Sequence, residues 1–280
     1  MWVYYNGRII PKKEVSISPD DRGFVFGDGV YEVLSVNKGH FLEEDAHYDR
    51  LAYSLSTLDI PIPDLQEIQS AVWQVLERND LIDGPAMVYL QLTRGVAPRR
   101  HPFPDVAPEP TVYITAQAYT PPWDLWEQGV EVIVLPDQRW GRCDIKSLNL
   151  LPNVLASQQA KVAGAYDALL HRDGVITEGS HTGVCCIRHG ILFTHPLTKC
   201  ILPSVTRGLV LRCCAELRIP VREQAIPLHL VHELDELMVL GTTTEVMPVV
   251  RVEGHPVGDG RPGPITRKLQ QAVREKVTSH

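Results

Sequence analysis

A chain of 280 residues exceeds the usual size of one domain, so the length predicts two. Hydrophobic residues make up 44% and charged residues 22%, as in globular proteins, and the formal net charge of −7 argues against a nucleic-acid binder. No apolar run reaches the roughly 18 residues of a membrane span, and no secretory signal is visible. The six cysteines form no C-x-x-C pair, so we expect reduced thiols, no metal site and a cytoplasmic location.

The first 118 residues predict an N-terminal domain of mixed α and β structure. Asn6-Gly7 between apolar residues indicates a hairpin turn, and apolar residues at helical spacing indicate two helices. A β-branched run ending before Asn37-Lys38-Gly39 indicates a strand, a turn and a second strand. The expected elements are a hairpin over 2–10, a strand ending at 36, helices over 47–58 and 65–76, and strands over 86–93 and 111–118.

Pro121 and Pro122 follow the last of these strands, so we place a linker at 119–127 and a C-terminal domain at 128–280. In this half Asp173-Gly174 indicates a hairpin turn, and Ser204 stands where a helix N-cap is expected. The expected elements are strands over 129–135, 167–171, 175–177, 184–187, 191–194 and 236–240, and helices over 153–163, from 204–206 onward and over 266–277. Strands mixed with helices predict an α+β or α/β fold.

Lys146 is the sole lysine between Lys38 and Lys161, and it lies among apolar residues such as Ile145 and Leu148. A lone lysine is usually a solvated surface residue. Apolar surroundings, however, lower the proton affinity of an amine and make it a usable nucleophile. Lys146 is therefore a candidate for Schiff-base formation.

Three features are candidates for binding a phosphate group. Ser204-Val205-Thr206 begins a helix, whose free N–H groups and dipole attract anions. Gly241-Thr242-Thr243-Thr244 follows a strand and offers three hydroxyl groups, and Arg50 offers a cation. Each also has an ordinary explanation as a helix cap, a polar turn or a solvated arginine, so each alone is a weak signal.

Two further features carry charge. Glu178 ends a hairpin strand that should be partly buried, where a carboxylate needs a cationic partner; a salt bridge at a partly exposed strand end is the ordinary alternative. Arg99 and His101 lie with Arg94 and Arg100 on a proline-rich loop. Such a group suits a small carboxylate, because arginine can bind both oxygens at once, although a solvated basic loop has the same composition.

Together these segments closely resemble the class IV, or fold-type IV, pyridoxal-phosphate-dependent aminotransferases, and among them the D-amino-acid branch. The resemblance runs nearly end to end, and the block around Lys146 is too long for chance agreement. The motifs that carry it are Asp21-Arg22-Gly23, Phe26-Gly27-Asp28-Gly29 with the strand to Val33, Thr-Arg-Gly-x-x-Pro-Arg-x-His at 93–101, Arg139-Trp140, 142–151, His171-Arg172, Thr177-Glu178-Gly179-Ser180 and Thr206-Arg207.

The resemblance implies a small N-terminal α/β domain and a larger C-terminal pseudo-barrel domain that binds pyridoxal 5'-phosphate. Lys146 would form the Schiff base with this cofactor and move the substrate proton, and Glu178 would keep the ring nitrogen protonated. The residues that would hold the phosphate are Arg50, Val205, Thr206 and Thr242.

The resemblance also implies a ping-pong transfer of the amino group from a D-amino acid, such as D-alanine or D-glutamate, to 2-oxoglutarate or pyruvate. Tyr31, Arg99 and His101 would bind the substrate carboxylate, and a partner subunit of a homodimer would lend the Arg/His loop. No nucleic-acid or membrane partner is expected.

The chain departs from the family pattern at Gly241, where serine is common, and at His181-Thr182-Gly183, where small hydroxyl residues and asparagine are usual. These departures change local contacts rather than the chemistry. Arg100 adds a charge that favours acidic substrates.

Other interpretations stay open within the same fold, namely a branched-chain L-amino-acid transaminase, an amine transaminase or an aminodeoxychorismate lyase. A non-catalytic binding protein is a further class. The spacing Arg99-x-His101 favours the D-amino-acid branch, and Lys146 together with Glu178 argues against a non-catalytic protein.

Overall fold

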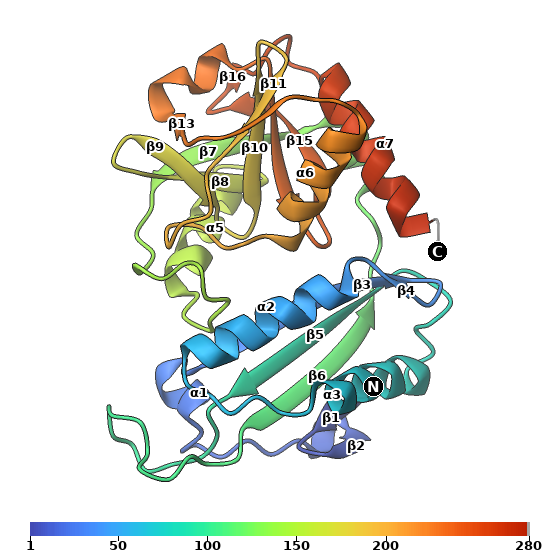
Figure 1. Ribbon diagram of the computed structural model, residues 1–280, viewed down its shortest axis with the longest axis vertical. Coiled ribbons are helices and arrows are strands. Elements are labelled where there is room, and N and C mark those ends of the chain that lie inside the picture. The colour runs from blue at the N-terminus through green and yellow to red at the C-terminus, as the bar shows by residue number, and fades with distance from the viewer. Residues whose placement is uncertain (279–280) are drawn as a thin grey trace. The chain divides into compact units, whose positions relative to one another are not determined.

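The computed structural model describes residues 1–278, which form two compact units (Figure 1). Unit 1 comprises Met1–Thr120 and Ile145–Asn149, and unit 2 comprises Pro121–Asp144 and the described chain from Leu150 onward. The segment with Lys146 thus belongs to unit 1, although the residues on both sides of it belong to unit 2. No helix of residues 1–278 is both long and apolar enough to cross a membrane.

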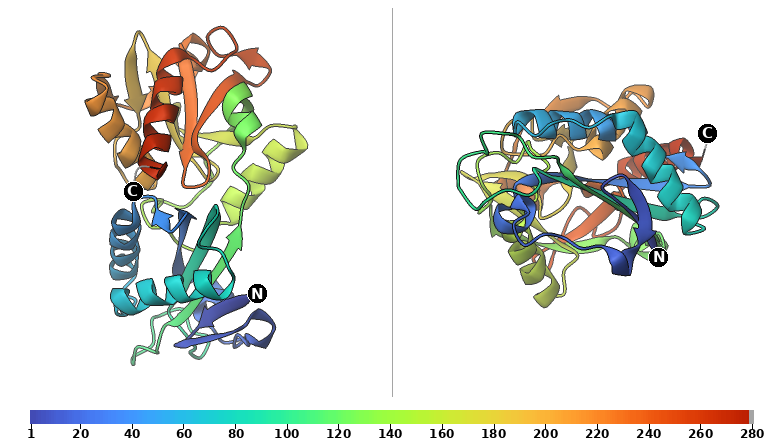
Figure 2. Two further views of the ribbon diagram at one scale, coloured as in Figure 1. Left: turned by 90° about the vertical axis from the view of Figure 1, so that its right-hand side faces the viewer. Right: turned by 90° about the horizontal axis from the view of Figure 1, so that it is seen from below.

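An antiparallel sheet of six strands is the frame of unit 1, in the order β2-β1-β6-β5-β3-β4. Its long strands β3 (Gly29–Asn37) and β5 (Ala86–Thr93) pair from Gly29 opposite Thr93 to Val36 opposite Ala86. Helices α2 (Glu44–Thr57) and α3 (Leu65–Arg78) pack against the sheet (Figure 2). The other elements are β1 (Trp2–Tyr5), β2 (Arg8–Pro11), η1 (Lys12–Glu14), α1 (Arg22–Phe26), β4 (His40–Phe41) and β6 (Thr111–Ala118).

The hydrophobic core of unit 1 explains the two long helices. Ile68, Val72 and Val75 recur at helical spacing on α3 and are fully or almost fully buried against the sheet. Each such side chain contributes about 1.5–3 kcal/mol when buried. Asp64 starts the helix by accepting a hydrogen bond from the N–H of Gln66 over 2.8 Å.

A ten-stranded sheet is the frame of unit 2, in the order β12-β11-β10-β14-β15-β7-β8-β9-β13, with β16 paired to β15. Its elements are α4 (Trp123–Gln128), β7 (Val130–Pro136), α5 (Leu151–Val162), β8 (Asp167–Arg172), β9 (Val175–Gly179), β10 (Gly183–Arg188), β11 (Ile191–Thr194), α6 (Val205–Glu216), β12 (Val221–Glu223), β13 (Ile226–Pro227), η2 (Leu228–Glu233), β14 (Glu236–Gly241), β15 (Glu245–Val252), β16 (His255–Pro256) and α7 (Pro264–Thr278).

The sheet of unit 2 must curl, because residues 180–182 alone join β9 to β10. A chain of this length spans roughly 10 Å. Five strand spacings separate β10 from β9 in the sheet order, which is about 24 Å in a flat sheet. The expected pseudo-barrel and the predicted α+β fold class are both confirmed.

Candidate active site

Lys146 lies beside β3 on a segment that pairs with this strand. The N–H of Tyr31 donates to the carbonyl of Lys146 over 3.0 Å, and the N–H of Leu148 donates to the carbonyl of Gly29 over 3.0 Å. The half-buried Lys146 side chain places Nζ 4.3 Å from the centroid of the Tyr31 ring. The structure therefore brings together two of the predicted site residues through a cation–π contact.

Arg50, on α2, makes a buried ion pair with Glu32 of β3. Its Nε and Nη2 donate to the two carboxylate oxygens over 2.7 and 2.8 Å, and His47 Nδ1 lies 2.8 Å from Oε2. Burial alone would raise the pKa of Glu32, but Arg50 and His47 overcome this effect and hold it at about 2. Glu32 and His47 orient the guanidinium that is expected to bind phosphate, but neither was predicted from the sequence. The only hint in the sequence is that a charged residue, Glu32, stands within a strand of apolar residues, and that His47 lies on the same helix as Arg50.

Arg99 and His101 lie on the loop between β5 and β6, around the ring of Phe26. The Arg99 Cζ is 5.2 Å from the ring centroid, and the ring centroids of His101 and Phe26 are 5.5 Å apart. Both side chains are exposed. They form one group within unit 1, and Tyr31 with Lys146 forms another.

In unit 2, Glu178 lies near the end of β9 and is 6% exposed. Its Oε1 accepts a hydrogen bond from Arg139 Nη1, and its Oε2 accepts one from the N–H of Leu202 over 3.0 Å. Burial raises the pKa of Glu178, whereas Arg139 and the Leu202 N–H oppose the rise. Because its pKa stays raised, a further cationic donor placed beside it, such as a protonated ring nitrogen, would stabilise the charged form of this carboxylate.

Arg139 connects Glu178 to a second buried acid, Asp137. Its Nε and Nη2 donate to the Asp137 oxygens Oδ1 and Oδ2 over 2.9 and 2.8 Å. Thr177 Oγ1 donates to Asp137 Oδ2 over 3.0 Å. Arg139 thereby fixes the orientation of Glu178. The sequence contains the Asp137-x-Arg139 spacing, but nothing in it links this pair to Glu178.

Three segments of unit 2 meet where α6 begins. Gly183, at the start of β10, pairs with Leu240 near the end of β14, and a Cβ added to Gly183 would lie 3.5 Å from Ser204 Cβ. Ser204 caps the helix, since its Oγ accepts from the N–H of Arg207 over 3.2 Å. Thr206 is buried in the first turn of α6, and Val205 is partly exposed.

Residues 242–244 form the turn between β14 and β15, and Thr244 anchors it. The Thr244 carbonyl accepts from Trp126 Nε1 over 2.8 Å. A Cβ on Gly241 would lie 3.3 Å from Thr244 Cβ and Oγ1, so a larger residue here would require Thr244 to shift by a few tenths of an ångström. Thr242, in the same turn, is partly exposed.

The turn after Glu178 is held by a buried acid. Ser180 Oγ and Thr182 Oγ1 donate to the Asp167 carboxylate over 2.5 and 2.6 Å. His181 Nδ1 lies 3.1 Å from Ser180 Oγ, and its side chain is half-exposed. The residues that depart from the family pattern thus belong to an intact hydrogen-bonded turn.

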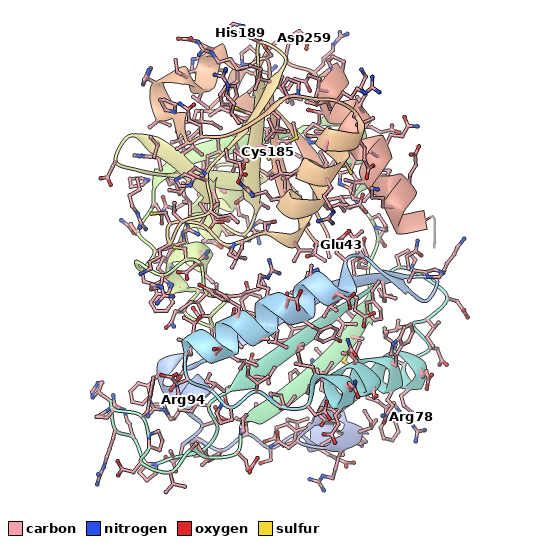
Figure 3. The ribbon with its side chains drawn as sticks, in the orientation of Figure 1. Glu43, Arg78, Arg94, Cys185, His189 and Asp259 are labelled. Carbon is pink, nitrogen blue, oxygen red and sulfur yellow. The ribbon has the colours of Figure 1, made fainter. Side chains whose placement is uncertain are left out.

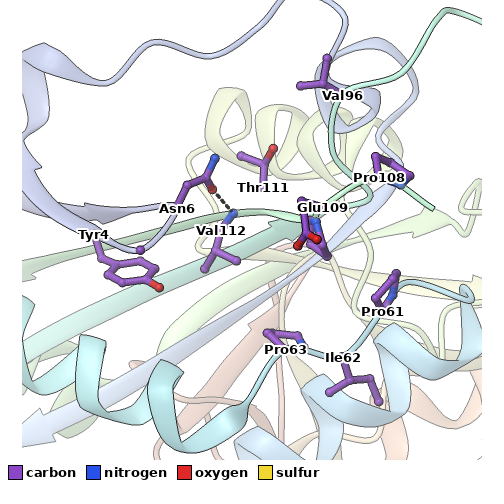
Figure 4. A pocket seen from close by; sticks show the side chains of 12 residues that line it. Tyr4, Asn6, Pro61, Ile62, Pro63, Val96, Pro108, Glu109, Thr111 and Val112 are labelled. Carbon is purple, nitrogen blue, oxygen red and sulfur yellow. Dashed lines mark hydrogen bonds between the residues drawn. The ribbon is translucent and has the colours of Figure 1, made fainter. Parts of the chain in front are cut away.

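A separate hollow of about 670 Å³ lies in unit 1 (Figure 4). Tyr4, Asn6 and four prolines line it, and the N–H of Val112 donates to Asn6 Oδ1 over 2.8 Å at its edge. The carboxylate of Glu109 supplies the one charge of its described lining and would repel a phosphate. None of the predicted site residues lines this hollow, so it is not the candidate site.

Side chains in each of the two units suit, by their chemistry, one of the functional groups of pyridoxal 5'-phosphate. Lys146 supplies an amine for the aldehyde, and Glu178 supplies a buried carboxylate that benefits from a cationic ring nitrogen. The start of α6 and the hydroxyl of Thr242 supply groups that suit a phosphate.

The model of the family "Amino-transferase class IV" matches residues 29–252. The chain is 37% identical over 279 residues to D-alanine aminotransferase of Staphylococcus aureus (strain MSSA476), with 99% of this chain and 98% of that protein covered. It is 38% identical over 281 residues to D-alanine aminotransferase of Bacillus licheniformis, with 100% and 98% covered.

Two solved structures share the fold. The branched-chain amino acid aminotransferase of Escherichia coli has a TM-score of 0.89 at 25% identity, with 96% of this chain and 92% of that chain covered. A hypothetical aminotransferase from Mycobacterium tuberculosis, in a PLP-bound form, has a TM-score of 0.86 at 22% identity, with 100% and 99% covered. This chain belongs to the class IV aminotransferase family.

Proposed function

We propose that the chain is a pyridoxal-phosphate-dependent transaminase that moves the amino group of a D-amino acid, such as D-alanine or D-glutamate, to 2-oxoglutarate or pyruvate. The observation that carries this proposal is the similarity, over almost the full length of both chains, to proteins named D-alanine aminotransferase. The described side chains support it, since they supply an amine, a buried carboxylate and groups suited to a phosphate.

Pyridoxal phosphate supplies an aldehyde that accepts the amino group and a ring that stores the electrons released at the substrate Cα. Lys146 Nζ would hold the cofactor between turnovers and carry the proton taken from the substrate Cα. Glu178 would hold the proton on the ring nitrogen, and Arg139 would keep its carboxylate in place. The residues proposed to bind the phosphate are Arg50, Val205, Thr206 and Thr242.

Tyr31, Arg99 and His101 would bind the substrate carboxylate. We also propose a cytoplasmic homodimer in which each subunit lends the Arg99 and His101 loop to its partner. The proposal of an interface near these residues is supported by two exposed aromatic side chains. Phe24 is 77% exposed and Phe103 is 51% exposed. Large exposed apolar side chains are typical of protein–protein contact surfaces.

The proposed activity is tested by incubating the purified protein with D-alanine and 2-oxoglutarate. Pyruvate and glutamate should form, the glutamate should be the D enantiomer, and L-alanine should give little or no product. Turnover of L-leucine in place of D-alanine would indicate a branched-chain transaminase. Release of pyruvate from aminodeoxychorismate without an acceptor acid would indicate the lyase, and either result would contradict the proposal.

A further inference from the structure

The motifs Asp21-Arg22-Gly23 and Phe26-Gly27-Asp28-Gly29 have no role in the chemistry described above. They form α1 and the residues on both sides of it, and Asp21 ties this helix to the sheet of unit 1. The Asp21 carboxylate accepts hydrogen bonds from the N–H of Gly23 over 2.8 Å and from the hydroxyls of Thr93 and Thr111 over 3.0 and 2.6 Å. Because these two threonines stand at the end of β5 and the start of β6, α1 is fixed at both ends of the Arg99 and His101 loop.

Asp28 binds two buried arginines that hold this loop. Arg22 Nε donates to Asp28 Oδ2 over 2.7 Å, and Arg94 donates to both Asp28 oxygens over 2.8 and 3.0 Å. Arg22 and Arg94 are each only 3% exposed. A carboxylate shared by two guanidinium groups gives charge-assisted hydrogen bonds of defined geometry.

Both arginines continue from Asp28 into the loop. Arg22 Nη1 donates to the carbonyl of Arg100 over 2.7 Å, which fixes the backbone between Arg99 and His101. Arg94, labelled in Figure 3, places Cζ 3.6 Å from the ring centroid of Phe103. The loop is therefore held at Arg100 and again at Phe103.

The Phe26 ring supports the side chains of the loop. Arg22 Cζ lies 4.8 Å and Arg99 Cζ lies 5.2 Å from its centroid, and the His101 ring centroid is 5.5 Å away. Arg99 and His101 are exposed, so without this ring their side chains would sample many rotamers in water.

We propose that Arg22, Phe26 and Asp28 are positioning residues that hold segment 99–101 in the conformation that binds the substrate carboxylate. The proposal rests on the proposed function of Arg99 and His101. Ordering a flexible loop at the moment of binding reduces affinity, and a loop held in advance avoids that cost. These three residues thus act on substrate binding through Arg99 and His101, without touching the substrate.

The variants Asp28→Asn and Phe26→Leu test this proposal, with Asp105→Asn, an exposed aspartate of the same loop, as the matched control. The first readout is the rate at which trypsin cleaves after Arg99 and Arg100, which requires no turnover. Both variants should be cleaved about ten times faster than wild type, because local opening governs proteolysis, and the control should match wild type. Equal cleavage rates in all four proteins would overturn the proposal.

The second readout separates positioning from general damage. Asp28→Asn and Phe26→Leu should raise KM for the D-amino acid about tenfold, with a much smaller change in kcat. The reason is that the contacts to the substrate carboxylate are made equally in the bound substrate and in the transition state. A fall in kcat at unchanged KM would contradict the proposal. Phe26→Leu decides the matter if Asp28→Asn does not fold.

The two readouts also distinguish this proposal from the proposed function. If the wild-type protein fails to transaminate D-amino acids, the proposed function fails. The trypsin comparison then still decides whether the three residues hold the loop.

Discussion

The buried pair of Glu32 and Arg50 links the stability of unit 1 to pH. Burial works against ionisation, but Arg50 and His47 hold the Glu32 pKa at about 2, below its ordinary value of 4.5. Because the folded-state pKa is lowered, the stabilisation is fully present above pH 4.5 and is lost as the pH falls towards 2. A shift of this size corresponds to about 3 kcal/mol.

The variant Glu32→Gln should therefore lower the free energy of unfolding by about 3 kcal/mol at pH 7, since it leaves Arg50 and its charge buried without the carboxylate. Urea unfolding of both proteins between pH 7 and pH 2 measures the difference, which should shrink below pH 4.5. Glu77→Gln, on the exposed side of α3, is the matched control. A difference that stayed constant down to pH 2 would contradict the account.

Individual site residues could be predicted from the sequence only where a motif carries them. Lys146 and Tyr31 come from different motifs, and the structure brings their side chains into contact. Arg139 could not be assigned, because its partner Glu178 is 39 positions away and neither residue type is rare. The roles of the candidate residues towards cofactor and substrate stay predictions.

The turn that follows β9 shows how an element positions Glu178, a candidate cofactor-binding residue. Gly179 comes directly after Glu178, and a Cβ added to it would collide with Thr182 Oγ1 and lie 2.5 Å from Asp167 Oδ2. Both atoms belong to the buried hydrogen bonds that hold the turn. Only glycine leaves room for this arrangement.

We expect Gly179→Ala to lower the free energy of unfolding by about 1–3 kcal/mol, the usual cost of overpacking. Gly141→Ala is the control in the same unit, because nothing lies within 4 Å of its added Cβ and its φ is not in the left-handed region. Thermal unfolding of both variants measures the effect. If Gly179→Ala and Gly141→Ala lower the free energy of unfolding equally, the collision of the added Cβ at Gly179 does not destabilise the turn.

At the level of elements, periodicity predicted the long helices and strands, and the expected 86–93 and 111–118 are the observed β5 and β6. The elements that were not predicted are η1, α1, α4, β12, β13, η2, β15 and β16. The helices α1 and α4 are too short to show a period, with five and six residues. The central strand β15 contains Pro248, which removes a backbone donor and normally argues against a strand between two neighbours.

On the scale of the whole molecule, the domain limits 1–118, 119–127 and 128–280 stay a prediction. The prolines at 121–122 mark the place where the chain passes from unit 1 to unit 2. The return of 145–149 to unit 1 could not be predicted, because it depends on backbone pairing with β3 rather than on composition.

The proposed homodimer predicts complementation between two inactive variants. Lys146→Ala lacks the amine, and Arg99→Ala lacks a residue lent to the partner. In mixed dimers one site would combine the intact Lys146 of one subunit with the intact Arg99 of the other. If co-expressed subunits pair at random, half of the dimers are mixed and each of these has one functional site out of two. The co-expressed mixture should therefore show about a quarter of the wild-type activity. If the mixture stays as inactive as its parents, each site uses its own Arg99.

The central claim is that the amine of Lys146 forms a reversible bond with an aldehyde cofactor. Reduction of the holoenzyme with sodium borohydride, followed by tryptic digestion and mass spectrometry, tests it most directly. The account predicts that the visible absorption band disappears, that the cofactor mass is found on the peptide containing Lys146, and that Lys146→Ala takes up no label. A label on another lysine, or no label on the wild-type protein, would contradict it.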